Sequence, residues 1–321
     1  MAIFEMSLPE LKRYEGRTPR PADFDAYWKR ALDELAAVDP AVELIPTNFK
    51  AASFAECFDL YFRGVGGARI HAKYVRPARP GDGRHPALLQ FHGYSMNAGD
   101  WFQLLPYAAA GMSILALDCR GQGGLSEDRG GVVGTTLRGH FIRGIDDHPD
   151  KLLFRQIFLD TVELAHIAMS LPEIDPGRIG ATGASQGGGL TLACASLEPR
   201  IKLVAPVYPF LSDYQRVWEM DLAKGAYEEL SEYFRRFDPR HERERELFTR
   251  LGYIDVEHLA PRIRGRVLFT VGLMDEICPP SSQFAAYNRI TAPKELVVYP
   301  DFSHEQLPDL SDIIFTFMVG L

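Results

Sequence analysis

The sequence predicts an α/β protein with a mostly parallel central sheet flanked by helices. From about residue 68 onward, short apolar runs alternate with segments that have the hydrophobic period of a helix. Hydrophobic residues make up 46% of the 321 residues and charged residues 24%, which is an ordinary globular composition. Because no segment repeats with a period of about twenty to fifty residues, we expect one continuous domain over residues 1–321.

The segment before this alternation, about residues 1–60, is expected to form an N-terminal helical extension. Turn residues at 17–21 are followed by Asp23, a suitable N-cap. Apolar residues from Phe24 to Leu35 then recur at the spacing of an amphipathic helix. Such a helix needs a body to pack on, so we expect it to lie against the main domain.

Apolar runs bounded by turn residues predict strands over residues 70–75, 87–91, 113–118, 178–184, 204–208, 267–271 and 296–299. Apolar residues at helical spacing over 153–168 predict a crossover helix between parallel strands. Further helices are expected over residues 101–110, 187–197, 282–290 and 311–318.

Two insertions interrupt the alternation. Residues 123–149 separate a strand from its helix, and a loop of this length is uncommon in a compact domain unless it has a function. Its apolar residues, at 132–137 and at Phe141 and Ile142, predict a two-stranded tongue that pairs with a neighbouring subunit. Residues 211–262 are rich in charged and aromatic residues and are expected to form a helical cap.

The net charge is −8, from 35 basic and 43 acidic residues, which disfavours nucleic acid or an anionic membrane as partner. We therefore expect a small uncharged substrate. The N-terminus lacks the pattern of a signal peptide and no apolar run is long enough for a membrane span, which predicts a cytoplasmic protein. The cysteines, at 57, 119, 194 and 278, are widely spaced and are expected to be reduced and buried. No metal-ligand motif occurs, so neither a metal nor a cofactor is expected.

Residues 183–187 form a G-x-S-x-G pattern centred on Ser185. A predicted strand precedes it and a predicted helix follows it, as in a nucleophile elbow. Small residues on either side let the chain double back while the hydroxyl projects above the sheet. The alternative interpretation of Ser185 is a glycine-rich turn in a helix–sheet contact.

Two further residues complete the chain order serine, acid, histidine that hydrolase triads of this type share. Asp275 and His304 each follow a late predicted strand, at the carboxyl edge of the sheet where ligands bind. Asp301 and Glu276 are the alternative acids. Asp301 is too close in sequence to His304 to orient its ring easily, so Asp275 is favoured.

Acyl transfer also needs N–H donors directed at the developing oxyanion. The amide of Gln186, directly after the nucleophile, is the first expected donor. The loop 91–94 follows an early strand and is expected to supply the second from Tyr94, unless this loop is an ordinary turn.

Three motifs carry a resemblance to a known family: Arg120-Gly121-Gln122, the extended elbow 183–188, and His304-Glu305. With them, and with further similar segments over nearly the whole chain, the sequence resembles carbohydrate esterase family seven. This family comprises acetyl xylan esterases and cephalosporin C deacetylases within the α/β-hydrolase superfamily. Residues 302–303 depart from the aromatic and glycine that relatives often carry before the histidine.

The resemblance implies the α/β-hydrolase fold and a serine carboxylesterase that removes O-acetyl groups from short xylo-oligosaccharides and from cephalosporin C. It also implies a homohexamer with active sites that face an inner cavity. Arg120, Gly121 and Gln122 are expected to be architectural, with the arginine tethering neighbouring loops. A closed, acetyl-sized pocket is expected from the bulky residues near the site, namely Tyr94, Trp101, Tyr208 and Pro209, with Phe210 as a further candidate.

Two alternative functions stay open. A serine peptidase of the prolyl oligopeptidase type shares the triad order, but it usually carries an additional large domain, for which about sixty N-terminal residues are too few. A non-catalytic binding protein of the same fold would usually have lost a triad member, and none is missing here.

Overall fold

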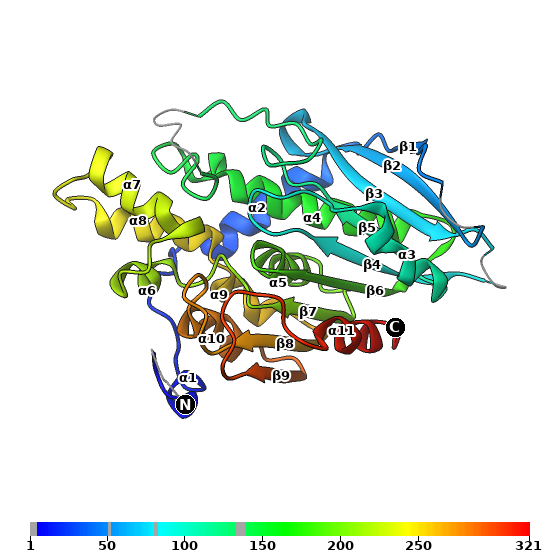
Figure 1. The fold of residues 1–321 in the computed structure, drawn as a ribbon. Coiled ribbons are helices and arrows are strands. Elements are labelled where there is room, and N and C mark those ends of the chain that lie inside the picture. Colours follow the sequence, from blue (N-terminus) through cyan, green and yellow to red (C-terminus); the bar gives the residue numbers. More distant parts are fainter. Residues whose placement is uncertain (1–4, 51–52, 80–82, 133–138) are drawn as a thin grey trace.

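The computed structural model describes residues 5–50, 53–79, 83–132 and 139–321. In this part of the chain, one sheet of nine strands runs through the molecule in the order β1-β2-β3-β5-β4-β6-β7-β8-β9 (Figure 1). The strands are β1 (Glu43–Pro46), β2 (Ala55–Arg63), β3 (Arg69–Pro77), β4 (His85–Phe91), β5 (Ser113–Leu117), β6 (Ile174–Ala184), β7 (Leu203–Val207), β8 (Arg266–Gly272) and β9 (Lys294–Tyr299).

The sheet has a parallel part and an antiparallel edge. Strands β5-β4-β6-β7-β8-β9 are parallel to one another, whereas β3 pairs antiparallel with both β2 and β5. The central strands are buried on both faces, as β5 shows with five buried residues, which explains why they read as continuous apolar runs. The α/β fold with a mostly parallel sheet is therefore confirmed.

The N-terminal extension differs from the expected helical one. It contains α2 (Phe24–Ala36), which begins after Asp23 as predicted, but also β1 and β2. Strand β2 pairs with β3 along nine residues. Its buried and exposed positions alternate only in part, so the two-residue hydrophobic period typical of a strand is weak in its sequence. Strand β1 is four residues long and exposed at the sheet edge, and it carries no burial pattern that sequence could reveal.

Helices cover both faces of the sheet. One face packs against α2, α4 (Leu153–Ser170), α5 (Gln186–Leu197) and α10 (Pro280–Arg289), whose apolar residues form the largest core cluster. The opposite face packs against α3 (Trp101–Ala109) and α11 (Leu310–Met318) through a smaller cluster. None of the helices in the described residues is both long and apolar enough to span a membrane.

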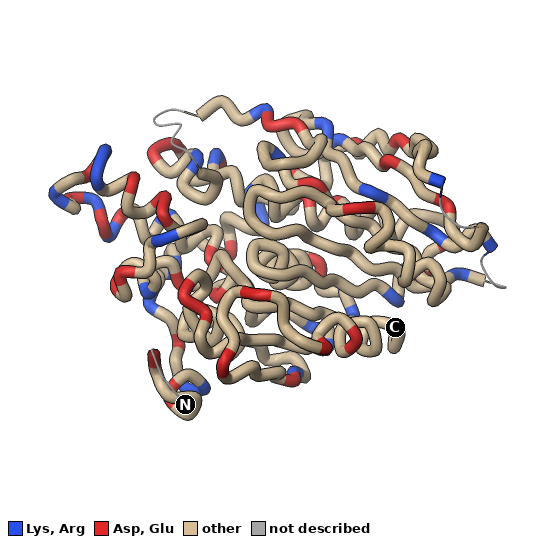
Figure 2. The backbone as a smooth tube through the Cα atoms, in the orientation of Figure 1, with Lys and Arg blue, Asp and Glu red and all other residues tan. Residues whose placement is uncertain are grey.

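The cap is helical, as expected. It comprises α6 (Tyr214–Glu219), α7 (Glu228–Phe237), α8 (Glu244–Leu251) and α9 (Val256–Leu259), and α7 and α8 project from the sheet at one end of the molecule (Figure 1). Figure 2 shows both signs of charge along α7 and α8, and most of the charged run 241–246 is exposed to solvent. The short helix α1 (Leu8–Leu11) packs against α10. Single 3₁₀ turns occur at Val65–Gly67, Pro149–Lys151, Gly225–Tyr227, Gly252–Ile254 and Ala260–Arg262.

The insertion 123–149 corrects one expectation. Its described residues, 123–132 and 139–149, contain no strand, and residues 133–138 of the predicted tongue lie outside the described part of the chain. Phe141 and Ile142 are buried within this chain, where the Phe141 ring stacks on Tyr214 of the cap. These two side chains therefore need no partner subunit to leave water. The sequence pattern does not reveal that the cap offers Phe141 and Ile142 a packing surface, and pairing of the tongue with a neighbouring subunit stays a prediction.

A buried carboxylate joins this insertion to the cap. Glu229 of α7 accepts hydrogen bonds from the backbone amides of His140 (2.8 Å) and Ile142 (3.2 Å). Burial raises the pKa of this carboxyl to about 8. The insertion is thus held in place by α7 rather than lying free on the surface.

Candidate active site

Ser185 lies on a sharp turn between β6 and α5. Its backbone has φ 57° and ψ −120°, a strained conformation for a residue with a side chain. A Cβ atom on Gly183 or Gly187 would lie 2.5 Å or 2.1 Å from the carbonyl oxygen of Phe91, so both positions require glycine. This is the geometry of a nucleophile elbow, and it excludes the alternative of an ordinary glycine-rich turn.

The structure brings together the serine, acid and histidine that sequence analysis selected. His304 Nε2 lies 3.0 Å from Ser185 Oγ, and His304 Nδ1 lies 2.8 Å from Asp275 Oδ2. The alternative acids, Glu276 and Asp301, are both exposed, and neither contacts the histidine ring in the described structure. The three side chains follow β6, β8 and β9, which are strands of the parallel part of the sheet, at its carboxyl edge.

Asp275 is fully buried and is surrounded by hydrogen-bond donors. Its Oδ1 accepts from the amides of Ile277 (2.9 Å) and Cys278 (2.8 Å), and its Oδ2 accepts from Gln283 Nε2 at 3.4 Å in addition to the histidine. Donors of this kind satisfy the oxygens of a buried carboxylate and fix its orientation. Sequence analysis missed Gln283, because no motif marks a glutamine on α10 that reaches back to the preceding loop.

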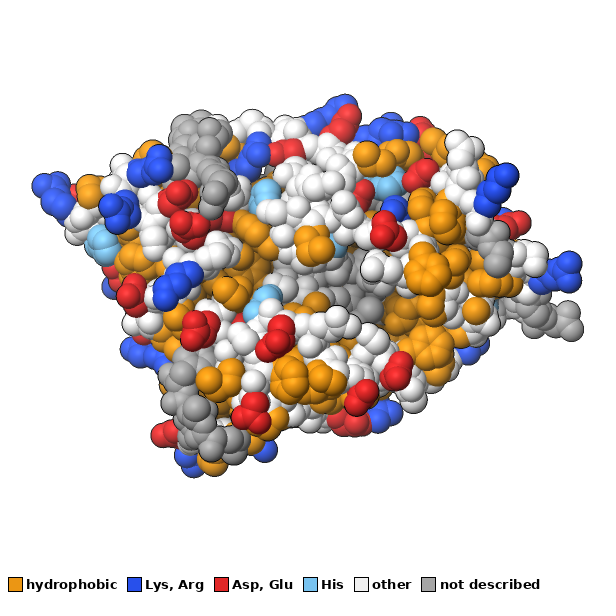
Figure 3. Space-filling view, viewed as in Figure 1, with side chains coloured by type: hydrophobic (Ala, Val, Ile, Leu, Met, Phe, Trp, Pro, Cys, Tyr) orange, Lys and Arg blue, Asp and Glu red, His pale blue; other side chains and the backbone are white. Residues whose placement is uncertain are grey.

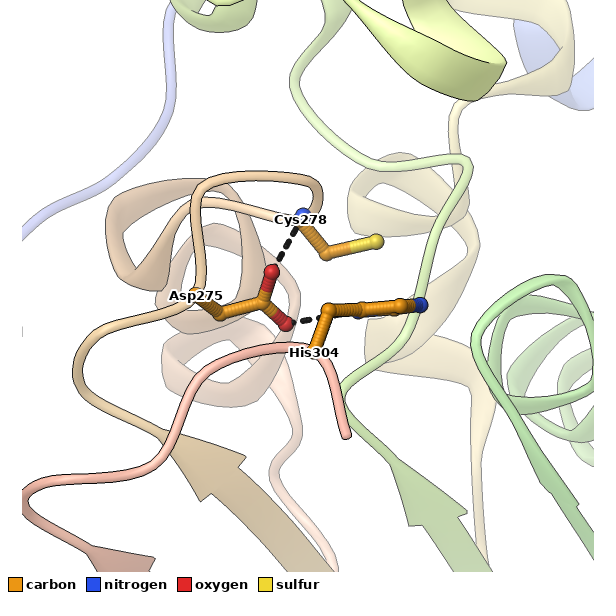
Figure 4. Close-up of side chains that lie close together, drawn as sticks. All are labelled: Asp275, Cys278 and His304. Carbon is orange, nitrogen blue, oxygen red and sulfur yellow. Dashed lines mark hydrogen bonds and ion pairs between the residues drawn. The ribbon is translucent and has the colours of Figure 1, made fainter. Parts of the chain in front are cut away.

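Cys278 also lies beside Asp275 and His304 (Figure 4). One ligand atom from each of Asp275, Cys278 and His304 lies within 4.8 Å of the others, which makes this the one metal-sized group of such donors in the described residues. The hydrogen bond between Asp275 and His304 already occupies two of the three, and burial raises the pKa of the Cys278 thiol well above its ordinary range. The arrangement therefore suits proton transfer better than metal binding.

The two expected oxyanion donors follow β4 and β6, which are neighbouring parallel strands. Gln186 is the first residue of α5, where backbone amides have no partner within the helix and the helix dipole favours negative charge. Tyr94 lies in the loop after β4. Among the hydrogen bonds of the described residues, none uses the backbone amide of either residue. Both amides are thus available to an oxyanion.

The Arg120-Gly121-Gln122 motif follows β5. Arg120 is buried and makes a bidentate contact with the Asp160 carboxylate, at 2.6 and 2.7 Å, and it donates to Val65 O at 3.0 Å. Gly121 has φ +64°, a conformation that favours glycine. The arginine thus joins three segments of the chain, as its type of side chain predicted.

A cavity of about 820 Å³ opens beside Ser185 and His304. Its far wall is apolar and comes from α3 and α11, with Tyr107, Leu310 and Phe315 among the lining residues. Figure 3 shows the hollow in this face, with hydrophobic side chains around it. The cavity is larger than the closed, acetyl-sized pocket that we expected. Sequence analysis predicted α11 as a helix, but it had no signal for the side on which α11 packs.

The expected pocket residues are distributed differently. Tyr208 lines the cavity, and its ring lies 4.6 Å from the His304 ring. Trp101 instead stacks on Phe49 at 6.3 Å, on the outer side of α3, and Pro209 packs beside Gly188 behind the elbow. Neither of these two lines the cavity in the described structure.

Tyr94 and Phe210 also lie away from this cavity. The Tyr94 side chain borders a neighbouring cavity of about 450 Å³ between the insertion and α7, and its hydroxyl accepts a hydrogen bond from the His140 amide at 2.9 Å. Phe210 is fully buried against the Tyr94 ring, with the ring centres 5.4 Å apart. Expecting all bulky residues near the triad to line one pocket was therefore wrong, because their direction depends on the fold of the loops that carry them.

Comparison with known proteins gives a consistent result. The family model described as acetyl xylan esterase (AXE1) matches residues 1–321. A curated relative, the acetyl esterase Axe7A of Xylanibacter ruminicola, is 29% identical over 293 residues, which are 89% of this chain and 64% of the relative's length.

Two solved structures resemble nearly the whole chain. Acetyl xylan esterase 1 from Thermoanaerobacterium sp. JW/SL YS485 is 59% identical, with a TM-score of 0.97 over 99% of both chains. An acetyl xylan esterase from Paenibacillus sp. R4 is 36% identical, with a TM-score of 0.94 over 98% of this chain and 99% of that one.

Proposed function

Since this chain belongs to the acetyl xylan esterase family, we propose that it is a serine carboxylesterase that removes O-acetyl groups from short acetylated xylo-oligosaccharides. Related small acetyl esters, such as cephalosporin C, belong to the same proposal. The observation that carries it is the hydrogen-bonded series from Ser185 through His304 to Asp275 at the mouth of an open cavity. No cofactor takes part in the proposed reaction.

The proposed reaction begins when Ser185 Oγ attacks the acetyl carbonyl carbon and His304 Nε2 takes the hydroxyl proton. Asp275 holds the imidazole tautomer and stabilises the imidazolium that forms. The amides of Gln186 and Tyr94 donate to the oxyanion of the tetrahedral intermediate.

The intermediate collapses when the bond between the acetyl carbon and the sugar oxygen breaks, and His304 gives its proton to the departing oxygen. A water molecule, deprotonated by the same histidine, then attacks the acetyl-serine. Collapse of the second intermediate releases acetate and returns the proton to Ser185. The histidine thus serves as base and as acid in each half of the cycle.

The two alternative functions have less support. A peptidase of the prolyl oligopeptidase type would use a separate domain to filter peptides, whereas the N-terminal segment here adds β1 and β2 to the main sheet. A non-catalytic binding protein has no need for a strained serine at hydrogen-bond distance from a histidine that is itself paired with a buried acid.

A homohexamer and a cytoplasmic location are further parts of the proposal, and the family resemblance supports the homohexamer. Light scattering at micromolar concentration tests the assembly, and a 36 kDa particle would refute it. Rapid deacetylation of intact high-molecular-weight xylan, without preference for short fragments, would also contradict active sites that face an enclosed cavity.

The decisive experiment is Ser185→Ala with the fold checked by circular dichroism. Esterase activity should fall by several orders of magnitude, because triad members act as a unit. A serine-directed phosphonylating reagent should add one group to the wild-type protein, at Ser185. Activity within tenfold of wild type, or a single adduct at another residue, would refute the assignment.

A further inference from the structure

We propose that Gln122 is a positioning residue for acyl transfer. Its side chain links the loop that carries Tyr94 to the start of α5 and so fixes the position of the two oxyanion donors relative to each other. This inference rests on the proposed function, because it assigns a role within the same reaction. Among the described residues, Gln122 has no hydrogen bond to the triad and is not one of the residues that line the cavity beside Ser185.

One side chain joins the two segments. Gln122 Oε1 accepts hydrogen bonds from the Ser95 amide at 2.9 Å and from Gln186 Nε2 at 3.1 Å. Gln122 Nε2 in turn donates to Gln186 Oε1 at 2.8 Å. The side-chain amide of Gln122 therefore connects Ser95, which follows Tyr94, with Gln186, which follows Ser185.

The Gln186 end of this connection is rigid. The Gln186 side chain is fully buried, and its Nε2 also lies 3.4 Å from His92 O and 3.7 Å from Cys119 Sγ. Without Gln122, the buried carbonyl oxygen of Gln186 would lose its hydrogen-bond donor, which is unfavourable in a site closed to water. The side chain would have to find another donor, and the start of α5 would lose its link to the loop of Tyr94.

The Ser95 end is strained. Ser95 has φ +60°, in the left-handed region that residues with a side chain seldom adopt. Such a conformation persists only where the surroundings hold it, and here the amide donates to Gln122 while the hydroxyl lies 2.9 Å from His140 Nε2. Release of the amide would let the peptide between Tyr94 and Ser95 relax, and the neighbouring Tyr94 amide would move with it.

The backbone next to Gln122 is fixed by contacts with the loop after β4. The Gly123 amide donates to Met96 O at 2.9 Å, and a Cβ atom on Gly123 would lie only 2.9 Å from Ser95 O. The turn after β5 and the loop after β4 are therefore in direct contact. Arg120, two residues earlier, anchors this turn in the core through Asp160. Because the backbone at Gln122 is fixed, its side chain can hold its two partners, and with them the adjacent oxyanion donors, in place.

The test is Gln122→Met, which keeps the length of the side chain and removes all three hydrogen bonds. We expect kcat on p-nitrophenyl acetate to fall about ten- to a hundredfold with KM within about twofold, because a displaced donor weakens stabilisation of the transition state alone. The inhibition constant of a trifluoromethyl ketone, whose adduct with a serine carries an oxyanion, should rise by a similar factor.

The matched control is Gln156→Met. Gln156 Oε1 accepts from Arg120 Nη1 at 2.8 Å, so this variant removes a hydrogen bond from the same motif on the side away from Ser95 and Gln186. It should lower thermal stability while leaving kcat and the inhibition constant close to wild type. A merely structural role for Gln122 would give the same result in both variants.

A wild-type kcat in Gln122→Met would overturn the proposal, as would a change in KM without a change in kcat. The proposal would also fail if neither Gln122→Met nor Gln122→Leu reached the wild-type circular dichroism spectrum, because Gln122 would then be required for folding. Ser185→Ala, assayed in parallel, separates the two claims. An active Ser185→Ala protein would refute the proposed function, whereas an inactive one beside a fully active Gln122→Met protein refutes only the role of Gln122.

Discussion

Replacement of Arg120 by methionine is expected to cost about 3–5 kcal/mol of folding free energy, the loss typical of breaking a buried ion pair. Both side chains of the pair with Asp160 are about 1% exposed, so water cannot replace the guanidinium. The variant would leave an unpaired carboxylate in the core, where burial raises the pKa of Asp160 and the nearby acid Glu163 raises it further. The Gln156 and Val65 oxygens would lose a donor as well.

The double variant Arg120→Met/Asp160→Leu separates the charge from the packing. Since the second substitution removes the unpaired carboxylate, the double variant should regain most of the loss and lie within about 1–2 kcal/mol of wild type. Urea unfolding followed by tryptophan fluorescence measures all three proteins. A single variant that loses less than about 1 kcal/mol, or a double variant no more stable than the single one, would refute this account of the ion pair.

Further predictions concern the acid, the pH dependence and the acyl group. Asp275→Asn should keep the fold and lower kcat by about 10⁴-fold through the wrong imidazole tautomer, and a larger loss in Asp301→Asn would show that the acid is misassigned. Burial near Asp213 raises the pKa of Asp255 to about 8, and burial beside Asp255 raises that of Glu257 well above its ordinary range. The folded state therefore holds more protons than the unfolded chain up to about pH 8, and stability should fall as pH rises through that window. In Glu257→Gln, the midpoint of urea unfolding should decrease less between pH 6 and pH 8.5 than in the wild type. An equal decrease in both proteins would contradict the assignment of this pH dependence to the buried acids. Among p-nitrophenyl esters, kcat/KM should be highest for acetyl and should drop for butyryl and longer chains; equal rates across the series would show that the large cavity accepts the acyl group.

The candidate site was predictable from sequence where its signals are local. The glycines of the elbow lie within two residues of Ser185, because the carbonyl of Phe91 leaves no room for a Cβ atom. Asp275 and His304 follow strands whose apolar runs are visible in the sequence. Recognising these residues requires only the ends of the predicted strands and the order of the residues along the chain.

The rest depends on contacts between distant segments. Gln122 reaches Ser95 across 27 positions and Gln186 across 64, and no pattern in the sequence connects them. Trp101 was expected in the pocket as a bulky residue near the site, but the rotation of α3 turns it toward Phe49. Helix rotation is fixed by packing against the sheet rather than by the local sequence.

The carboxylate of Glu229 has a consequence for attempts to alter specificity by grafting. It belongs to the cap, yet the amides that it binds belong to the insertion, and one of those amides, that of His140, also donates to the Tyr94 hydroxyl. A transplanted cap that lacks this carboxylate would therefore leave the Ile142 amide without its acceptor and the His140 amide with the Tyr94 hydroxyl alone, which would loosen the loop of Tyr94. Chimeras should exchange residues 123–149 and 211–262 as a single cassette, because the two segments share one buried anchor although more than sixty positions of chain separate them.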